Sequence, residues 1–198
     1  MSTTEKTYHH GDLRAALLAA AIESLESGET PSMRAVARRA GVSPAAPYRH
    51  FADRDALDSA LAVRGFDELH EVLTAALAHA SATASAQETL SALAVAYVRF
   101  ALRRPALFHL MFGNECDDLD SERVRASGQL HDLLGGVVVR LFPTANGAGL
   151  PLALWSVAHG LAFLHLDGKL RPEPTDEVEA RVRAAIAAIL ALNQGEVS

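Results

Sequence analysis

Apolar side chains recur at steps of three and four residues along almost the whole chain, and no stretch alternates apolar with polar residues. The first pattern is typical of amphipathic helices and the second of strands, so the sequence predicts an all-α fold. Alanine, the strongest helix former, occurs 38 times. Glycines and prolines separate about nine expected helices, at residues 11–27, 33–40, 43–50, 54–79, 88–103, 105–112, 119–141, 150–166 and 175–193.

Capping residues fix several of these boundaries. Ser32 and Asp53 stand where an N-cap is expected, and Gly41 stands where a helix end favours a left-handed residue. Ser43 and Pro44 read as an N-cap and first helical position. We expect a three-helix N-terminal domain over residues 1–53 and a C-terminal helical bundle domain over residues 54–198.

Residues 141–166 contain no formal charge, which raises the possibility of a membrane span. The cleaner part, residues 150–166, is shorter than the ~20 apolar residues that a spanning helix needs and contains two histidines. This favours a buried helix and no membrane association. The first residues lack the apolar segment of a signal peptide, and a single cysteine, Cys116, excludes an intrachain disulfide. We therefore expect a cytoplasmic protein.

Charge is distributed unevenly along the chain. The formal net charge of −6 arises entirely after residue 55, because residues 1–55 contain seven basic and seven acidic side chains. Residues 31–50 contain four arginines and no acid. A local basic patch in an acidic protein is typical of a small DNA-reading module on a larger body, although a solvated helix face would give the same count.

Residues 32–54 carry the most informative pattern. Two short helices joined by the turn Gly41-Val42-Ser43 match helix-turn-helix geometry, and Ala37 is small where the helices approach each other. Phe51 is expected to pack in the core and Tyr48 to reach a phosphate. An ordinary helical hairpin is the alternative explanation of this spacing.

Two segments extend this pattern to a known family. YHHGDLRAALLAAA and MRAVARRAGVSPAAPYRHFADRDAL, within residues 8–60, resemble the DNA-binding domain of TetR family transcriptional regulators. YVRFALRRPALFHLMFG (97–113) and LWSVAHGLAFLHLDG (154–168) are similar to one subgroup of the family's ligand-binding and dimerisation domains, which we describe as WHG-like. The resemblance implies a homodimeric, ligand-responsive regulator that binds a double-stranded DNA operator, most often a repressor.

The resemblance also implies DNA contacts. Phosphate or groove contacts are expected at Ser32, Arg34, Ser43, Pro44, Ala45, Ala46, Tyr48, Arg49, His50 and Arg54. Pro47 departs from the family pattern, since many relatives have Leu or Ile there and a proline removes a helical hydrogen bond. Pro44, Ala45 and Ala46 have no hydrogen-bonding side chain, so base reading would depend on Tyr48, Arg49 or DNA shape.

The remaining helices would form the dimer contact and an effector pocket. Helices 150–166 and 175–193 are apolar enough to pair with a second subunit, the latter through a stripe that includes Val178, Val182, Ile186 and Leu192. An unidentified small-molecule effector would bind among Tyr97, Phe100, Leu107, Phe108, Met111, Phe112, Leu134, Val138 and Trp155, although a plain core explains each of these residues better when it is taken alone.

Other function classes have little support in the sequence. The histidines of this half form no known metal signature, and no phosphate loop, nucleophile elbow or HExxH motif is present, so we expect no metal, no cofactor and no enzyme. The alternative function is a helical protein-interaction module whose helix-turn-helix is vestigial, which Pro47 would motivate.

Overall fold

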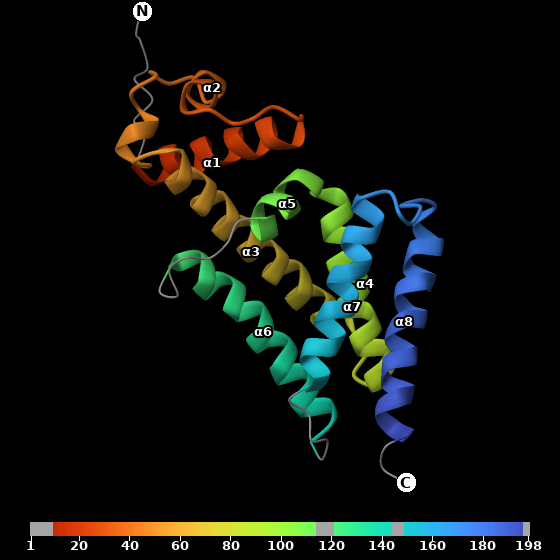
Figure 1. Ribbon diagram of the computed structural model, residues 1–198. Coiled ribbons are helices and arrows are strands. Elements are labelled where there is room, and N and C mark those ends of the chain that lie inside the picture. The colour runs from red at the N-terminus through yellow and green to blue at the C-terminus, as the bar shows by residue number, and fades with distance from the viewer. Residues whose placement is uncertain (1–9, 114–120, 144–148, 196–198) are drawn as a thin grey trace, which may run out of the picture. The chain divides into compact units, whose positions relative to one another are not determined.

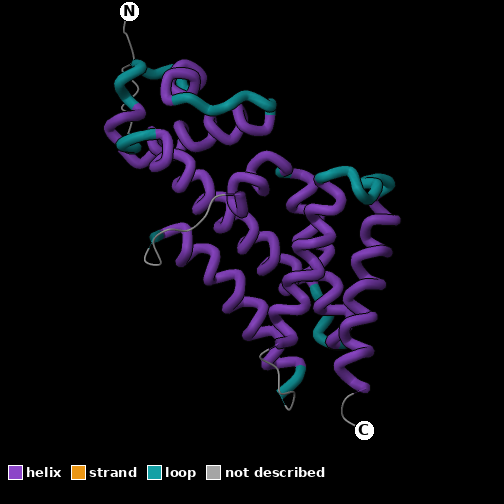
Figure 2. Tube along the Cα trace, viewed as in Figure 1, coloured by secondary structure: helices purple, strands orange, loops and turns teal. Residues whose placement is uncertain are grey.

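The computed structural model describes residues 10–113, 121–143 and 149–195 of the 198-residue chain. Within these ranges it contains helices and connecting loops but no strand, which confirms the all-α prediction (Figures 1 and 2). The elements are α1 (His10–Glu26), α2 (Met33–Arg39), the 3-10 turn η1 (Pro47–Arg49), α3 (Arg54–His79), α4 (Ala86–Arg103), α5 (Pro105–Gly113), α6 (Glu122–Leu141), α7 (Gly149–Leu166) and α8 (Thr175–Gly195).

These elements form two compact units. Among the described residues, the first unit contains 10–65 and 106–113, and the second contains 66–105, 121–143 and 149–195. The chain therefore passes between units within α3 and at the start of α5. The expected division into domains 1–53 and 54–198 stays a prediction.

The first unit is built on α1. Its buried face includes Leu17, Ala21 and Ile22, which pack with Met33 and Val36 of α2. The same core continues through Phe51, Leu57 and Leu61. Gly28 and Gly41 have φ angles of 80° and 70°, in the left-handed region that glycine adopts without strain, so both turns form where the sequence predicts them.

Two of the three expected N-caps of this unit are present, and the cap expected at Ser43 is absent because the α-helix that it would start does not form. The Ser32 hydroxyl accepts a hydrogen bond from the Ala35 N–H at 3.2 Å, and an Asp53 carboxylate oxygen accepts one from the Ala56 N–H at 2.8 Å. A second carboxylate caps a helix that is distant in the sequence. Glu26 of α1 accepts hydrogen bonds from the Ala106 and Leu107 N–H groups at 3.4 and 3.2 Å, so it caps the start of α5.

The expected helix 43–50 is wrong as an α-helix. A turn precedes the short 3-10 segment Pro47–Arg49, held by hydrogen bonds from the Ala46 N–H to the Ser43 carbonyl and from the His50 N–H to the Pro47 carbonyl. Pro47 has no N–H to donate to the Ser43 carbonyl, so the α-helical bond at this point cannot form. The local chain uses the tighter spacing of three residues instead.

The second unit centres on α4, which packs against α7 and α8 (Figure 1). A capping box starts α4, because the Ser85 hydroxyl accepts from the Glu88 N–H at 3.2 Å while Glu88 accepts from the Ser85 N–H at 2.7 Å. The stripe Val178, Val182 and Ile186 of α8 is buried within the chain itself, which corrects its expected place in a dimer contact. Leu192, from the same expected stripe, is 76% exposed.

Helix α7 also differs from its expected burial on every side. Its buried residues occupy one face, at Leu150, Leu154, Ala158, Ala162 and His165. Leu152 and Leu164 are 58% and 43% exposed. Among the described helices, α7 alone has the length and composition of a membrane-spanning helix, a test that core helices of soluble proteins also pass.

Candidate nucleic-acid interface and effector cavity

The helix-turn-helix presents hydroxyl groups and apolar side chains in different directions. Ser32 and Ser43 are exposed, and Tyr48 is 55% exposed. Phe51, three residues after Tyr48, is 2% exposed and lies in the core. The structure thus agrees with the expected division between a packing Phe51 and an outward Tyr48, whose hydroxyl is accessible to a phosphate.

Three arginines of this unit project into solvent. Arg34, Arg38 and Arg49 are exposed and form no hydrogen bond or ion pair within the described part of the chain. Arg39, in contrast, pairs with Glu29 at 3.4 Å. Arg38 is absent from the contacts expected from the sequence, although it belongs to the basic patch that the charge count identified. Arg34 and Arg38 are four residues apart and therefore share one face of α2.

Arg54, at the start of α3, is held by a carboxylate. Its Nε donates to both Asp58 carboxylate oxygens at 2.8 Å, one helical turn away. This ion pair is half-exposed, so it contributes little to stability, but it restricts the direction of the side chain. The terminal nitrogens of Arg54 form no hydrogen bond with any described group.

The recognition turn itself offers few polar groups. Pro44 and Ala45 are exposed, Ala46 and His50 are half-buried, and Pro47 is buried. The His50 ring lies 6.4 Å from the Phe51 ring, measured between centroids. The outward surface of residues 44–46 is therefore made of methyl and methylene groups, flanked by Ser43 on one side and Tyr48 and Arg49 on the other.

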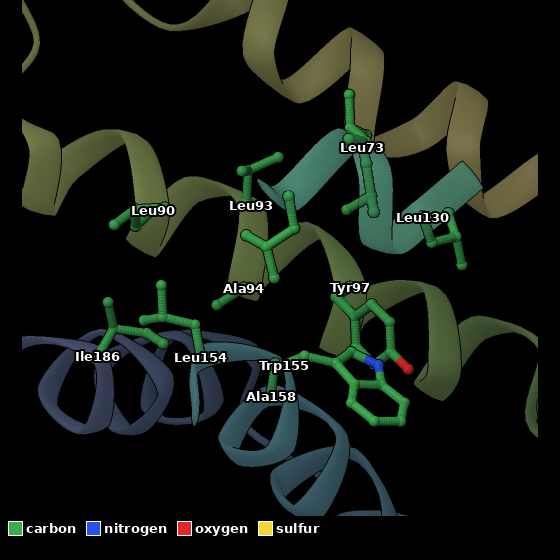
Figure 3. A pocket seen from close by; sticks show the side chains of 12 residues that line it. Leu73, Leu90, Leu93, Ala94, Tyr97, Leu130, Leu154, Trp155, Ala158 and Ile186 are labelled. Atoms are coloured by element: carbon green, nitrogen blue, oxygen red, sulfur yellow. The ribbon is translucent and has the colours of Figure 1, made fainter. Parts of the chain in front are cut away.

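The second unit contains a cavity of about 50 Å³. Its lining comes from five helices, and α4 contributes a stripe at helical spacing (Figure 3). The lining residues are Leu73, Leu90, Leu93, Ala94, Tyr97, Leu130, Leu133, Leu134, Leu154, Trp155, Ala158 and Ile186.

A hydrogen-bonded aromatic group lies beside this cavity. The Tyr97 hydroxyl is 2.8 Å from His159 Nδ1, and Trp155 lines the cavity beside the same tyrosine. Burial raises the pKa of Tyr97 and lowers the pKa of His159, so both side chains are neutral at neutral pH. His131 packs edge-on against Trp155, with ring centroids 4.8 Å apart.

The expected pocket residues separate into three groups. Tyr97, Leu134 and Trp155 line the cavity, whereas Phe100 and Val138 are buried elsewhere in the second unit. Leu107, Phe108, Met111 and Phe112 belong to the first unit, where the rings of Phe108 and Phe112 are tilted against each other with centroids 4.8 Å apart. The expectation from sequence missed Leu90, Leu93 and Ala94, although their spacing from Tyr97 on one helix pointed to a shared face.

His165 is a second buried histidine of this unit. It is 2% exposed, and its Nε2 lies 3.3 Å from an Arg181 terminal nitrogen. Burial and the positive charge of Arg181 lower the pKa of His165. Across residues 10–113, 121–143 and 149–195, no three His, Cys, Asp or Glu side chains gather in a way that would hold a metal ion.

Comparison with known families gives two matches. Residues 17–61 match the family described as bacterial regulatory proteins of the tetR family, and residues 90–189 match the tetracyclin repressor-like C-terminal domain. A comparison with curated proteins gave no match.

Several solved structures are similar to this chain. A protein of unknown function from Rhodococcus sp. RHA1 is 38% identical, with a TM-score of 0.77, over 92% of this chain and 97% of that one. A TetR-family transcriptional regulator from Streptomyces coelicolor is 21% identical, with a TM-score of 0.74, over 96% of this chain and 85% of that one. A TetR family regulator from Marinobacter aquaeolei VT8 is 20% identical, with a TM-score of 0.67, over 89% and 94%. The second and third likenesses concern the fold alone.

The two family matches together include the helix-turn-helix and more than half of the residues that follow it. TetR regulators act by binding DNA rather than by catalysis. The chain belongs to the TetR family of DNA-binding transcription regulators.

Proposed function

We propose that this protein is a cytoplasmic homodimer that binds a palindromic operator as a repressor and is released by a small-molecule effector. The observation that carries the proposal is the outward surface of the helix-turn-helix. Arg34, Arg38 and Arg49 are exposed there without carboxylate partners among the described residues, in a protein whose net charge is −6. A basic surface of this kind attracts the phosphates of a duplex, which the rest of an acidic protein would otherwise repel.

The proposed contacts divide into phosphate and base contacts. Phosphates are bound by Ser32, Arg34, Tyr48, His50 and Arg54, together with Arg38 and Arg49. Ser43, Pro44, Ala45 and Ala46 face the major groove. Because Pro44, Ala45 and Ala46 carry no donor or acceptor, their share of base reading is apolar contact with thymine methyl groups.

The exposed apolar face of α7 supports the homodimer. Leu152 and Leu164 are solvent-exposed on the isolated chain, and the outward face of α8 adds Ala184, Ala188 and Leu192. Contiguous exposed apolar surface is typical of a protein–protein contact, and small alanines allow two helices to approach closely. A two-fold dimer would present two recognition turns about one duplex turn, ~34 Å, or a multiple of it, apart.

Control by an effector would act through populations of two states. A ligand that binds the cavity in one conformation better than in the other shifts the equilibrium between them. Helix α3 is continuous from Arg54 to His79, so it contains both a proposed phosphate contact and the cavity residue Leu73. We propose that movement of this helix changes the separation of the two recognition turns.

One experiment tests the DNA-binding part of the proposal. The purified full chain is used to capture genomic fragments, the enriched site is footprinted, and its affinity is measured over a series of salt concentrations. We expect a palindromic footprint and an affinity that falls steeply with salt, by about 0.9 in the log–log slope for each phosphate neutralised. Weak binding of every fragment, without dependence on salt, would refute the proposal.

The 3-10 recognition turn favours a second candidate, a protein-interaction module with a vestigial helix-turn-helix. A turn with a proline at position 47 and methyl groups at positions 45 and 46 has little capacity for specific hydrogen bonding. This candidate predicts no footprint in the experiment above, while the second unit still forms a dimer.

A further inference from the structure

The lining of the cavity in the second unit extends along α4 and differs between its two ends. Leu90 and Tyr97 lie seven residues apart on α4, which corresponds to about 10 Å along the helix axis. Leu90 and Ile186 form one end, while Tyr97 and Trp155 lie at the other (Figure 3). A molecule that fills the cavity therefore extends along α4.

The chemistry of the lining changes from one end to the other. None of the twelve lining side chains carries a formal charge, and ten of them are leucine, isoleucine or alanine. The polar side-chain atoms of this lining are the Tyr97 hydroxyl and the Trp155 indole nitrogen, both at the same end. That hydroxyl is joined to His159 Nδ1 at 2.8 Å, so the polar end is a set of hydrogen-bonded neutral groups.

A charged ligand would be poorly matched to this surface. Moving a carboxylate or an ammonium group out of water costs several kcal/mol unless a counterion or several hydrogen bonds replace the lost hydration. The lining supplies no counterion for either sign. A neutral polar group loses much less hydration and can exchange it for a hydrogen bond with the tyrosine or the indole.

We propose that the effector is an uncharged, elongated and largely apolar molecule whose polar group lies against Tyr97 and Trp155. The inference rests on the proposed ligand response and names the chemical class of the ligand. The apolar part lies along Leu90, Leu93 and Ala94, where its transfer from water supplies most of the binding free energy at about 25 cal/mol per Å².

The size of the cavity adds a consequence. Ligand sites for small molecules occupy about 300–1,000 Å³, well above the roughly 50 Å³ present here. We therefore expect the lining helices to separate when a ligand binds. Helix α6 contributes Leu130, Leu133 and Leu134 to the lining and packs against α7, so we expect α6 to move outward when ligand enters.

The test uses Trp155 as an internal reporter, because it is the sole tryptophan of the chain. The full-length protein is titrated at neutral pH with 1-octanol, octanoate and octylammonium, which share one chain and differ in head-group charge. We expect saturable changes in tryptophan emission with 1-octanol and binding about tenfold or more weaker for both charged probes. Amide exchange in α6 should accelerate with 1-octanol.

Variants connect the binding to the polar end. Tyr97→Phe removes the hydroxyl and should raise the Kd of 1-octanol about fivefold, the usual value of one hydrogen bond. Thr89→Val, the matched control, removes a hydroxyl of the same helix that bonds the Ser85 carbonyl and does not line the cavity, so it should leave this Kd unchanged. Ala158→Leu fills the cavity and should weaken 1-octanol binding with Tyr97 intact.

Three outcomes would overturn the inference. Octanoate or octylammonium could bind as tightly as 1-octanol, all three probes could leave the emission unchanged, or Tyr97→Phe could bind 1-octanol as the unaltered protein does. Operator affinity, measured in parallel, separates this inference from the proposed function. Release of DNA by a charged probe alone refutes the ligand class and supports the response, whereas tight 1-octanol binding with unchanged DNA affinity supports the class and refutes the response.

Discussion

The methyl groups of Ala45 and Ala46 limit what this protein can read in a major groove. They cannot donate or accept a hydrogen bond, so the base feature within their reach is the thymine C5-methyl group. Ser43, Tyr48 and Arg49 border this apolar surface and are exposed. The bordering groups would fix the position of the turn, and the methyl contacts would distinguish thymine from other bases.

Replacing thymine by uracil in the operator tests this reading. We expect each methyl group removed beneath the recognition turn to weaken binding by about 0.8 kcal/mol, the value of one buried methylene-sized group. Fluorescence anisotropy with singly substituted duplexes measures the effect, and substitutions outside the footprint serve as controls. Equal affinities for all singly substituted duplexes would show that the alanines do not read thymine.

Arg54 provides a second test with a single side chain. Arg54→Ala should weaken binding to all operator sequences alike and reduce the log–log salt slope by about 0.9, the effect of one phosphate contact. Asp58→Asn is the matched comparison, because it removes the charge of the Asp58 partner and leaves the arginine in place. It should preserve or strengthen DNA binding. A loss confined to one base position in Arg54→Ala would contradict the phosphate role.

Among the elements, the recognition turn shows the limit of sequence reasoning most clearly. Ser32, Gly41 and Asp53 each act locally, so their residue types alone predicted their places in caps and turns. Pro47 departs visibly from the family pattern. The length of a helix, however, depends on a balance between small local free-energy contributions and packing, which one residue type does not fix. The lost hydrogen bond at Pro47 tipped this balance toward a 3-10 turn.

Helices α3 and α5 meet closely at Gly65. A Cβ atom at this position would lie 2.6 Å from Met111 Sδ and 3.2 Å from Leu107 Cγ. Gly65→Ala should therefore destabilise the protein by roughly 1–3 kcal/mol through overpacking, as measured by urea unfolding. Met111→Ala removes the nearest atoms. Gly65→Ala should therefore cost less stability when it is added to the Met111→Ala protein than when it is added to the unaltered protein. Additive effects of the two substitutions would exclude the steric explanation.

Across the whole molecule, the fold class was predictable from the sequence and the lining of the cavity was not. Helical periodicity repeats over the chain, so many residues report the same fold. The cavity depends on which stripe of each helix meets which neighbour, and one sequence does not specify such pairings. Aromatic residues around Phe108 were expected to line the pocket, yet they pack in the first unit, while α4 supplies the lining through Leu90, Leu93 and Ala94.

The buried histidines make stability depend on pH. His159 and His165 have lowered pKa values in the folded protein, so below about pH 6.5 the unfolded chain binds more protons than the folded one. Stability is then complete above this pH and declines as the pH falls. We expect the thermal midpoint to drop between pH 7.5 and 5.5, and His159→Gln to reduce this drop. A drop as large in His159→Gln as in the unaltered protein would refute the assignment.

Assembly into a dimer is the last property that the exposed face of α7 predicts. Leu164→Glu places a charge on the outward side of the helix, where it costs little in an isolated subunit but would be buried without a partner in a two-fold contact. We expect this variant to elute as a monomer with an unchanged helical content, as measured by light scattering and circular dichroism. Its operator affinity should fall because two half-sites are no longer bound jointly.

Leu166→Glu is unsuitable as a control because Leu166 is half-buried, whereas the exposed Val139→Glu on α6 adds the same charge outside the proposed contact. A dimeric Leu164→Glu protein, or a monomer formed equally by Val139→Glu, would move the subunit contact away from this face of α7.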